Sequence, residues 1–114
     1  MSTEATLNHH LHALREGIDS IMSDYSEGSV LLTPDGMIVG RNRIRSFFEG
    51  VLANSPPGLF QALTLIRQDI HGEIAYILWK AEPFVPLATD TFVIRDGKIV
   101  AQSFAALVLP AAAS

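Results

Sequence analysis

Apolar residues in the first part of the chain recur at steps of three and four, which is the spacing of one face of a helix. This stripe consists of Leu7, Leu11, Leu14, Ile18, Ile21 and Tyr25. It predicts one amphipathic helix, or two consecutive helices, over residues 4–24. Gly17 interrupts the stripe and marks the expected break between the two.

A second apolar stripe follows in the middle of the chain. It consists of Ile44, Phe47, Phe48, Val51 and Leu52, which fit the helical template without exception. The pattern predicts a helix over residues 41–53. The segment 54–58, which holds two prolines and a glycine, ends it.

The remaining segments have the composition of strands. Residues 29–33 and 37–39 predict a short hairpin around a turn at 34–36, and longer strands are expected at 60–70, 73–82, 88–95 and 98–109. The pair Asp96-Gly97 supplies the positive φ angles of a tight hairpin turn between the last two strands. Residues 110–114 form a short tail that is expected to fray.

This order of elements predicts the fold class. Helices followed by a run of strands indicate one α+β domain over residues 1–114, with a curved antiparallel sheet wrapped around the N-terminal helices. Such a sheet forms a cone with an apolar interior and an open end. That is a common geometry for a small-molecule pocket.

Composition narrows the classes of partner. Hydrophobic residues make up 48% of the chain, which leaves apolar surface for a second subunit to cover, so a homodimer is expected. A net charge of −4 argues against a nucleic-acid partner. No apolar run reaches the roughly 18 residues of a membrane span, and no secretory signal is seen, so the expected location is cytoplasmic. Cysteine is absent, which excludes a thiolate metal site.

Asp90 is the strongest lead to function. It lies inside the expected strand 88–95, where acidic residues are depleted, and burial of its charged form would raise its pKa. A neutral Asp90 would donate a hydrogen bond to a substrate carbonyl or enolate. The structural alternative is a carboxylate paired with a cation or with backbone amides at the rim of the sheet.

The histidines near the N-terminus suggest a metal cluster at first sight. At about 100° per residue, however, only His10 falls beside the apolar stripe, while His9 and His12 point to the opposite side and are expected to be solvent-exposed. Three residues at this spacing do not converge on one ion, so no metal is expected. His10 is the candidate base, because imidazole titrates near neutral pH.

Other polar or aromatic residues are candidates for the cavity wall. Tyr25 and Trp79 belong to apolar patterns, and each carries a polar group that a buried site must satisfy. Gln102 shares strand parity with Phe104, and a buried glutamine needs hydrogen-bond partners, of which a ligand is one.

Several segments together resemble the nuclear transport factor 2-like superfamily, in the branch that contains ketosteroid isomerases and SnoaL-like polyketide cyclases. The segments that carry the resemblance are 21–30, Thr33-Pro-Asp-Gly36, 40–48, Thr89-Asp-Thr-Phe92 and 96–100. The resemblance covers nearly the whole chain. It implies the α+β cone, and it turns the side of the strand that bears Gln102 toward the pocket.

The resemblance also implies roles for individual residues. In ketosteroid isomerases a protonated strand carboxylate and a helix tyrosine form an oxyanion hole, while a second carboxylate takes the proton. Asp90 matches the oxyanion-hole aspartate, because it precedes a Thr-Phe step and the hairpin. The position of the base is Thr33, whose hydroxyl is no base at neutral pH. A gap-free count puts His9 at the tyrosine position, whereas the helical periodicity favours His10.

Two functions remain open from the sequence. The first is a homodimeric cone that binds a small, largely apolar, carbonyl-bearing molecule, with Asp90 as hydrogen-bond donor and with Tyr25, Thr33, Trp79, Gln102 and Phe104 as ligand contacts. If it is an enzyme, isomerase- or cyclase-type proton transfer is expected, without a cofactor and with His10 or a residue that the sequence does not identify as base. The alternative is a non-catalytic ligand-binding or dimerisation module, which Thr33 in place of a base favours. An open, polar-lined cavity around Asp90 would favour the first.

Overall fold

The computed structural model describes residues 1–108. The tail 110–114 and the last residue of the expected strand 98–109 lie outside the described residues. Along the chain, the elements are α1 (Thr3–Ala13), α2 (Ile18–Met22), β1 (Tyr25–Thr33), β2 (Gly36–Val39), α3 (Arg41–Asn54), β3 (Leu63–His71), β4 (Ile74–Ala81), β5 (Val85–Arg95) and β6 (Lys98–Leu107).

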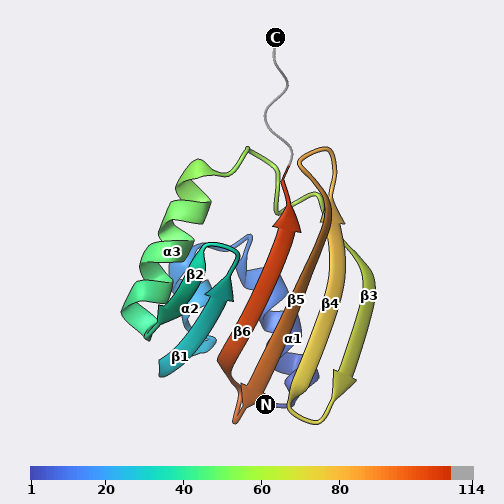
Figure 1. Cartoon of the computed structure of the whole chain (residues 1–114). Coiled ribbons are helices and arrows are strands. Elements are labelled where there is room, and N and C mark those ends of the chain that lie inside the picture. Colours follow the sequence, from blue (N-terminus) through green and yellow to red (C-terminus); the bar gives the residue numbers. More distant parts are fainter. Residues whose placement is uncertain (109–114) are drawn as a thin grey trace.

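The strands form one six-stranded sheet in the order β2-β1-β6-β5-β4-β3 (Figure 1). Neighbouring strands are antiparallel except for β1 and β6, which run parallel and pair through partners such as Leu31 and Gln102. The expectation of a wholly antiparallel sheet is therefore wrong at this pair. No tight turn joins β1 to β6, so only their packing fixes the relative direction of these two strands.

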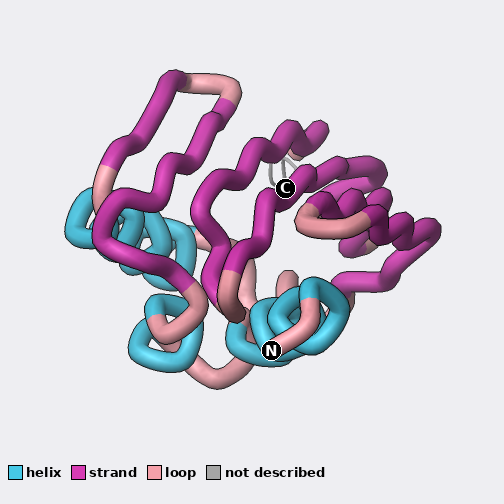
Figure 2. The backbone as a smooth tube through the Cα atoms, turned by 90° about the horizontal axis from the view of Figure 1, so that it is seen from below, coloured by secondary structure: helices cyan, strands magenta, loops and turns pink. Residues whose placement is uncertain are grey.

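The sheet curves around the helices, as the sequence predicts. Figure 2 shows the strands arching over the three helices, which all lie on one side of the sheet. Large residues from the helices and from the concave face of the sheet fill the core, including Leu7, Ile21, Met22, Leu31, Ile44, Ile77, Phe92 and Ile99. Among the described residues, no helix is long and apolar enough to cross a lipid bilayer.

The N-terminal helical segment breaks where the sequence predicts. Ser2 caps α1 by accepting a hydrogen bond from the amide of Ala5 at 3.0 Å, and Gly17, with φ of 114°, is the N-cap residue before α2. The helical stripe predicts helix as far as residue 24, but α2 ends at Met22. The amide of Ile99 donates to the carbonyl of Asp24, and Tyr25 pairs with Ile99, so β6 draws this part of the chain into the sheet.

Three strands also begin three or four residues away from the expected position. β1 begins at Tyr25 rather than at 29 because of this pairing with β6. β3 begins at Leu63 rather than at 60, because residues 58–62 form a turn closed by the amide of Ala62 on the carbonyl of Gly58. β5 begins at Val85, which pairs with Ala81, so it is longer than the segment 88–95.

The turn between β5 and β6 has the expected backbone conformation. Asp96 has φ of 52° and Gly97 has φ of 74°, so both central residues lie in the left-handed region. Glycine adopts this conformation without steric cost, whereas a Cβ raises its energy by about 1–2 kcal/mol.

We therefore predict opposite effects for two glycine-to-alanine substitutions. Gly97→Ala should lower the free energy of unfolding by about 1 kcal/mol because of its positive φ. Gly50→Ala, inside α3 and with open space around the new Cβ, should raise it by about 0.5–1 kcal/mol because alanine favours the helix. Urea unfolding measures both. Shifts of the same sign would contradict this account of the turn.

Candidate functional site

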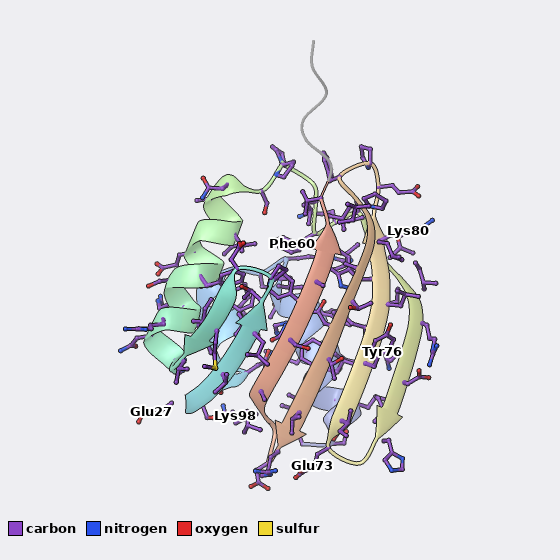
Figure 3. All side chains as sticks on the ribbon, in the orientation of Figure 1. Glu27, Phe60, Glu73, Tyr76, Lys80 and Lys98 are labelled. Carbon is purple, nitrogen blue, oxygen red and sulfur yellow. The ribbon has the colours of Figure 1, made fainter. Side chains whose placement is uncertain are left out.

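A cavity of about 220 Å³, partly open to solvent, lies between the concave face of the sheet and helices α1 and α3. Its wall is mostly apolar and carries six aromatic side chains, namely Phe47, Phe48, Phe60, Trp79, Phe92 and Phe104. Figure 3 places Phe60 near the end of the sheet where β4 carries Lys80, opposite the end marked by Glu73. The interior of the cone is therefore not filled by side chains, which is the observation that favours ligand chemistry.

Few polar side chains reach this cavity. They are His10, Ser55, Asp90 and Gln102, together with the indole of Trp79. Within the part of the chain that the structure describes, no lysine or arginine lines the cavity, and Asp90 is the one acidic group on its wall. No cation from these residues neutralises Asp90 there.

Asp90 faces the cavity because of the alternation along β5. Ala88, Asp90 and Phe92 all point to the concave side, and Asp90 pairs across the sheet with Ile77 on β4 and Phe104 on β6. Sheet pairing at this position places the carboxylate between the side chains of the two neighbouring strands.

The carboxylate of Asp90 accepts a hydrogen bond on each oxygen. The indole Nε1 of Trp79 donates to Oδ1 at 2.7 Å, and the amide Nε2 of Gln102 donates to Oδ2 at 2.9 Å. The hydroxyl of Tyr25 donates to Oε1 of the same glutamine, which fixes the amide so that its nitrogen faces Asp90. The result is a continuous hydrogen-bonded chain across β1, β6, β5 and β4.

Burial raises the pKa of Asp90 to about 6, while the hydrogen bonds from Trp79 and Gln102 partly offset this rise. The ionised form therefore predominates at pH 7, and both oxygens already accept N–H donors. The expectation that Asp90 remains protonated and acts as a standing hydrogen-bond donor is not favoured by this geometry. A carboxyl group with a pKa this close to neutral is suited to exchange a proton.

His10 lies in the cavity wall, as the helical periodicity predicts. It is buried among Tyr25, Phe48 and Phe92, whose rings it meets edge-on. Burial, together with the neighbouring His9, lowers the pKa of His10 to about 4, so the imidazole is neutral at pH 7. Its Nδ1 is enclosed without a hydrogen-bond partner and lies 3.8 Å from Oδ2 of Asp24.

The other two histidines do not line the cavity. His9 is partly exposed, and its Nδ1 donates to both carboxylate oxygens of Asp24 at 2.8 and 2.9 Å. His12 is exposed, and its ring lies 3.2 Å from the carbonyl of Asn8. The gap-free alternative, which favours His9 over His10, therefore leads to a residue outside the cavity. Within residues 1–108, no group of three or more histidine and acidic side chains is arranged to hold a metal ion.

The predicted ligand contacts divide into two groups. Trp79, Gln102 and Phe104 line the cavity. Tyr25 is buried behind Gln102 and touches that residue rather than the cavity.

Thr33, which the sequence predicts as a ligand contact, lies outside the cavity wall. It lies at the end of β1, where its hydroxyl donates to the carbonyl of Gly36 at 3.0 Å and accepts from the amide of Asp35 at 3.1 Å. These bonds stabilise the turn before β2, which lies away from the cavity. Thr33 does not line the cavity, so this geometry gives no support to its prediction as a ligand contact.

Sequence reasoning missed two features of the site. Asp24 is not among the candidate residues from the sequence, yet it is buried to all but 2% of its surface beside His9 and His10. The sequence pattern puts Phe60 in a strand, yet this residue belongs to the turn between α3 and β3 and lies on the cavity wall. The feature of the sequence that could have indicated the burial of Asp24 is its position between Met22 and Tyr25, which are both buried.

This chain is similar to known proteins in its three-dimensional structure and not detectably in its sequence. No known protein family matches the chain by sequence, and no curated protein matches it. Solved structures match it closely in shape. An NTF2-like protein from Burkholderia xenovorans superimposes with a TM-score of 0.74 at 17% identity, covering 97% of this chain and 87% of that one.

Two further solved structures carry more specific descriptions. A candidate polyketide cyclase from Sinorhizobium meliloti has a TM-score of 0.70 at 16% identity, covering 89% of this chain and 94% of that one. A protein with a ketosteroid isomerase-like fold from Catenulispora acidiphila, in complex with trimethylamine, has a TM-score of 0.67 at 11% identity, covering 88% and 83%. The chain therefore has the nuclear transport factor 2-like fold, which it shares with SnoaL-like and ketosteroid isomerase-like proteins.

Proposed function

We propose that the chain binds a small, largely apolar, carbonyl-bearing molecule in this cavity and transfers a proton next to its carbonyl group. One observation carries the proposal: Asp90, the only acidic group on the wall among residues 1–108, is held by two N–H donors and has a pKa of about 6. For the Asp90 carboxylate to act as a proton acceptor, the ligand in the cavity must carry a proton acidic enough to be removed. An enolisable carbonyl compound supplies one.

The size and wall of the cavity set the class of ligand. An apolar cavity of about 150 Å³ holds benzene, so about 220 Å³ suits a compound of one or two rings. The aromatic lining favours a flat, unsaturated ring system, because aromatic rings pack well edge-to-face and in offset stacks.

Asp90 is suited to both halves of such a reaction. As a carboxylate it accepts a proton from the carbon next to the carbonyl, and as a carboxylic acid it returns that proton to a second position, which gives an isomerisation. Trp79 and Gln102 fix the carboxylate during both steps, so little reorganisation is needed. Neutral His10 lies in the same wall as a second polar group. The cyclase and isomerase-like names among the structural neighbours are compatible with this chemistry.

The proton-transfer step predicts isotope exchange in a simple two-ring ketone. In D₂O the protein should accelerate the exchange of the protons next to the carbonyl of 2-tetralone, and Asp90→Asn should slow that exchange by at least about 100-fold, because asparagine cannot accept the proton. NMR spectroscopy of 2-tetralone measures the rate.

The matched control is Asp35→Asn, which removes an exposed carboxylate in the turn between β1 and β2. It should exchange the ketone protons at the wild-type rate. If 2-tetralone raises the melting temperature but no exchange above the buffer rate occurs, the protein is a non-catalytic ligand-binding module.

The pKa of Asp90 predicts a pH dependence of stability. Its folded pKa of about 6 lies above the ordinary value of 3.8, so its protonated form favours the folded state. This contribution is complete below about pH 4 and is lost as the pH rises through 6. Relative to Asp90→Asn, the wild type should lose ~2–3 kcal/mol of unfolding free energy between pH 4 and 7.

Urea unfolding of both proteins at several pH values measures this difference. The His10 imidazole is common to both proteins, so its own titration largely cancels in the comparison. A constant difference between the two proteins across this range would show that the Asp90 pKa is not raised by burial.

We further propose that the chain forms a homodimer through the convex face of the sheet. Alternation along the strands puts apolar side chains with 47% or more of their surface exposed on that one face, namely Leu32, Met37, Val39, Ile74, Leu87 and Leu107. Small or β-branched residues such as Thr91 and Ala105 fill the middle of the face. An apolar surface of this kind is typical of a subunit interface.

A charge in the middle of this face should separate the subunits. Thr91→Arg should convert the dimer to a monomer, because an arginine would be buried there without a partner. Gln61→Arg, an exposed position in the turn before β3, is the matched control and should leave the dimer intact. Sedimentation velocity measures the assembly, and a wild-type monomer at micromolar concentration would contradict the proposal.

A further inference from the structure

Asp24 is a buried acid that the proposed proton transfer does not use. It is exposed to only 2%, follows α2 and lies beside α1 rather than on the cavity wall. His9 donates Nδ1 to both of its oxygens, and Lys98, whose Nζ donates to the carbonyl of Ser23, lies close enough to affect the charge of Asp24. Burial raises the pKa of Asp24, while the charges and the hydrogen bond of these neighbours act in the opposite direction.

The unpartnered nitrogen of His10 points to the same carboxylate. Nδ1 of His10 is enclosed and lies 3.8 Å from Oδ2 of Asp24, which is just beyond hydrogen-bond distance. His10 is part of the cavity wall, and of its two ring nitrogens only Nδ1 is enclosed without a partner among the described residues. With Nδ1 near Asp24, Nε2 is the nitrogen that can meet a ligand.

A neutral imidazole carries a single proton, and its position depends on the surroundings. If the proton were on Nε2, the lone pair of Nδ1 would face the carboxylate of Asp24 and repel it. With the proton on Nδ1, the N–H faces the carboxylate and is attracted to it. A carboxylate that orients a histidine in this way is a common supporting arrangement in proteins.

We propose that Asp24 holds the proton of His10 on Nδ1 and thereby leaves Nε2 as a hydrogen-bond acceptor toward the cavity. Asp24 is then a positioning residue, which acts on the ligand through His10. His9 keeps the carboxylate in place by occupying both of its oxygens from the solvent side.

This arrangement narrows the ligand class of the proposed function, on which this part of the inference rests. Asp90 on β5 and Nε2 of His10 on α1 both accept hydrogen bonds, so the ligand must bring a donor. A phenol, or an enol that stands in equilibrium with its ketone, carries such a hydroxyl. The preferred ligand is therefore a one- or two-ring ketone that enolises or bears a hydroxyl group, rather than a simple ketone.

The tautomer of His10 is measured directly by ¹⁵N NMR of the imidazole nitrogens at pH 7. Wild type should carry the proton on Nδ1. Asp24→Asn removes the carboxylate charge and offers an amide donor, so the proton should move to Nε2. Asp19→Asn, the same change at an exposed position on α2, is the matched control and should leave the tautomer as in wild type.

Ligand binding supplies the second readout. Wild type should bind 2-naphthol more tightly than its methyl ether, which has the same rings but no donor. Asp24→Asn should reduce this preference about tenfold, the equivalent of one hydrogen bond. Measuring the same pair in Asp90→Asn separates the two acceptors, because the preference due to His10 should persist there.

The outcomes are distinct. A wild-type His10 with its proton on Nε2 overturns the proposal without any variant, even if Asp24→Asn fails to fold. A proton that stays on Nδ1 in folded Asp24→Asn overturns the role of Asp24. The proposed function fails separately, through absence of proton exchange in 2-tetralone, and such a failure leaves the tautomer result intact.

Discussion

The burial of the Asp90 carboxylate in an apolar cone is the constraint on which the rest of this site depends. A carboxylate removed from water is unstable unless hydrogen bonds replace its hydration. Trp79 and Gln102 supply these bonds, one to each oxygen. Because two N–H donors replace only part of the lost hydration, the pKa settles near 6. The carboxylate is thus held in place and stays able to exchange a proton.

Several features of the surrounding structure hold the Asp90 carboxylate in place. Gln102 is useful only with its amide nitrogen toward Asp90, and the Tyr25 hydroxyl fixes that orientation. Tyr25 reaches this place because β1 pairs in parallel with β6, so the one parallel pair of the sheet is part of the site. A second buried acid, Asp24, lies on the other side of the cavity wall and faces His10.

The two carboxylates differ in their surroundings, and this difference separates their roles. Asp90 reaches the cavity and is the only charged group there among the described residues, so it can react with a ligand. Asp24 is enclosed and already bonded to His9, so it acts on the cavity only through His10. The fold alone does not assign either role, since proteins that share a fold carry out unrelated chemistry. The assignment rests on the partners of each side chain.

The sequence by itself determined the elements, the α+β class and the residue most worth testing. Periodicity placed His10 on the inner face of α1, and the Asp96-Gly97 pair marked the turn, because both signals depend on local geometry alone. Only the tertiary structure decided the hydrogen-bond partners of Asp90, the burial of Asp24 and the place of Thr33 outside the cavity wall. Each of these depends on contacts between distant segments: Trp79 and Gln102 on either side of Asp90, α1 against Asp24, and the position of the first hairpin relative to the cavity. Local patterns carry no information about which side chain a buried group will meet, and that encounter sets its charge and its chemistry.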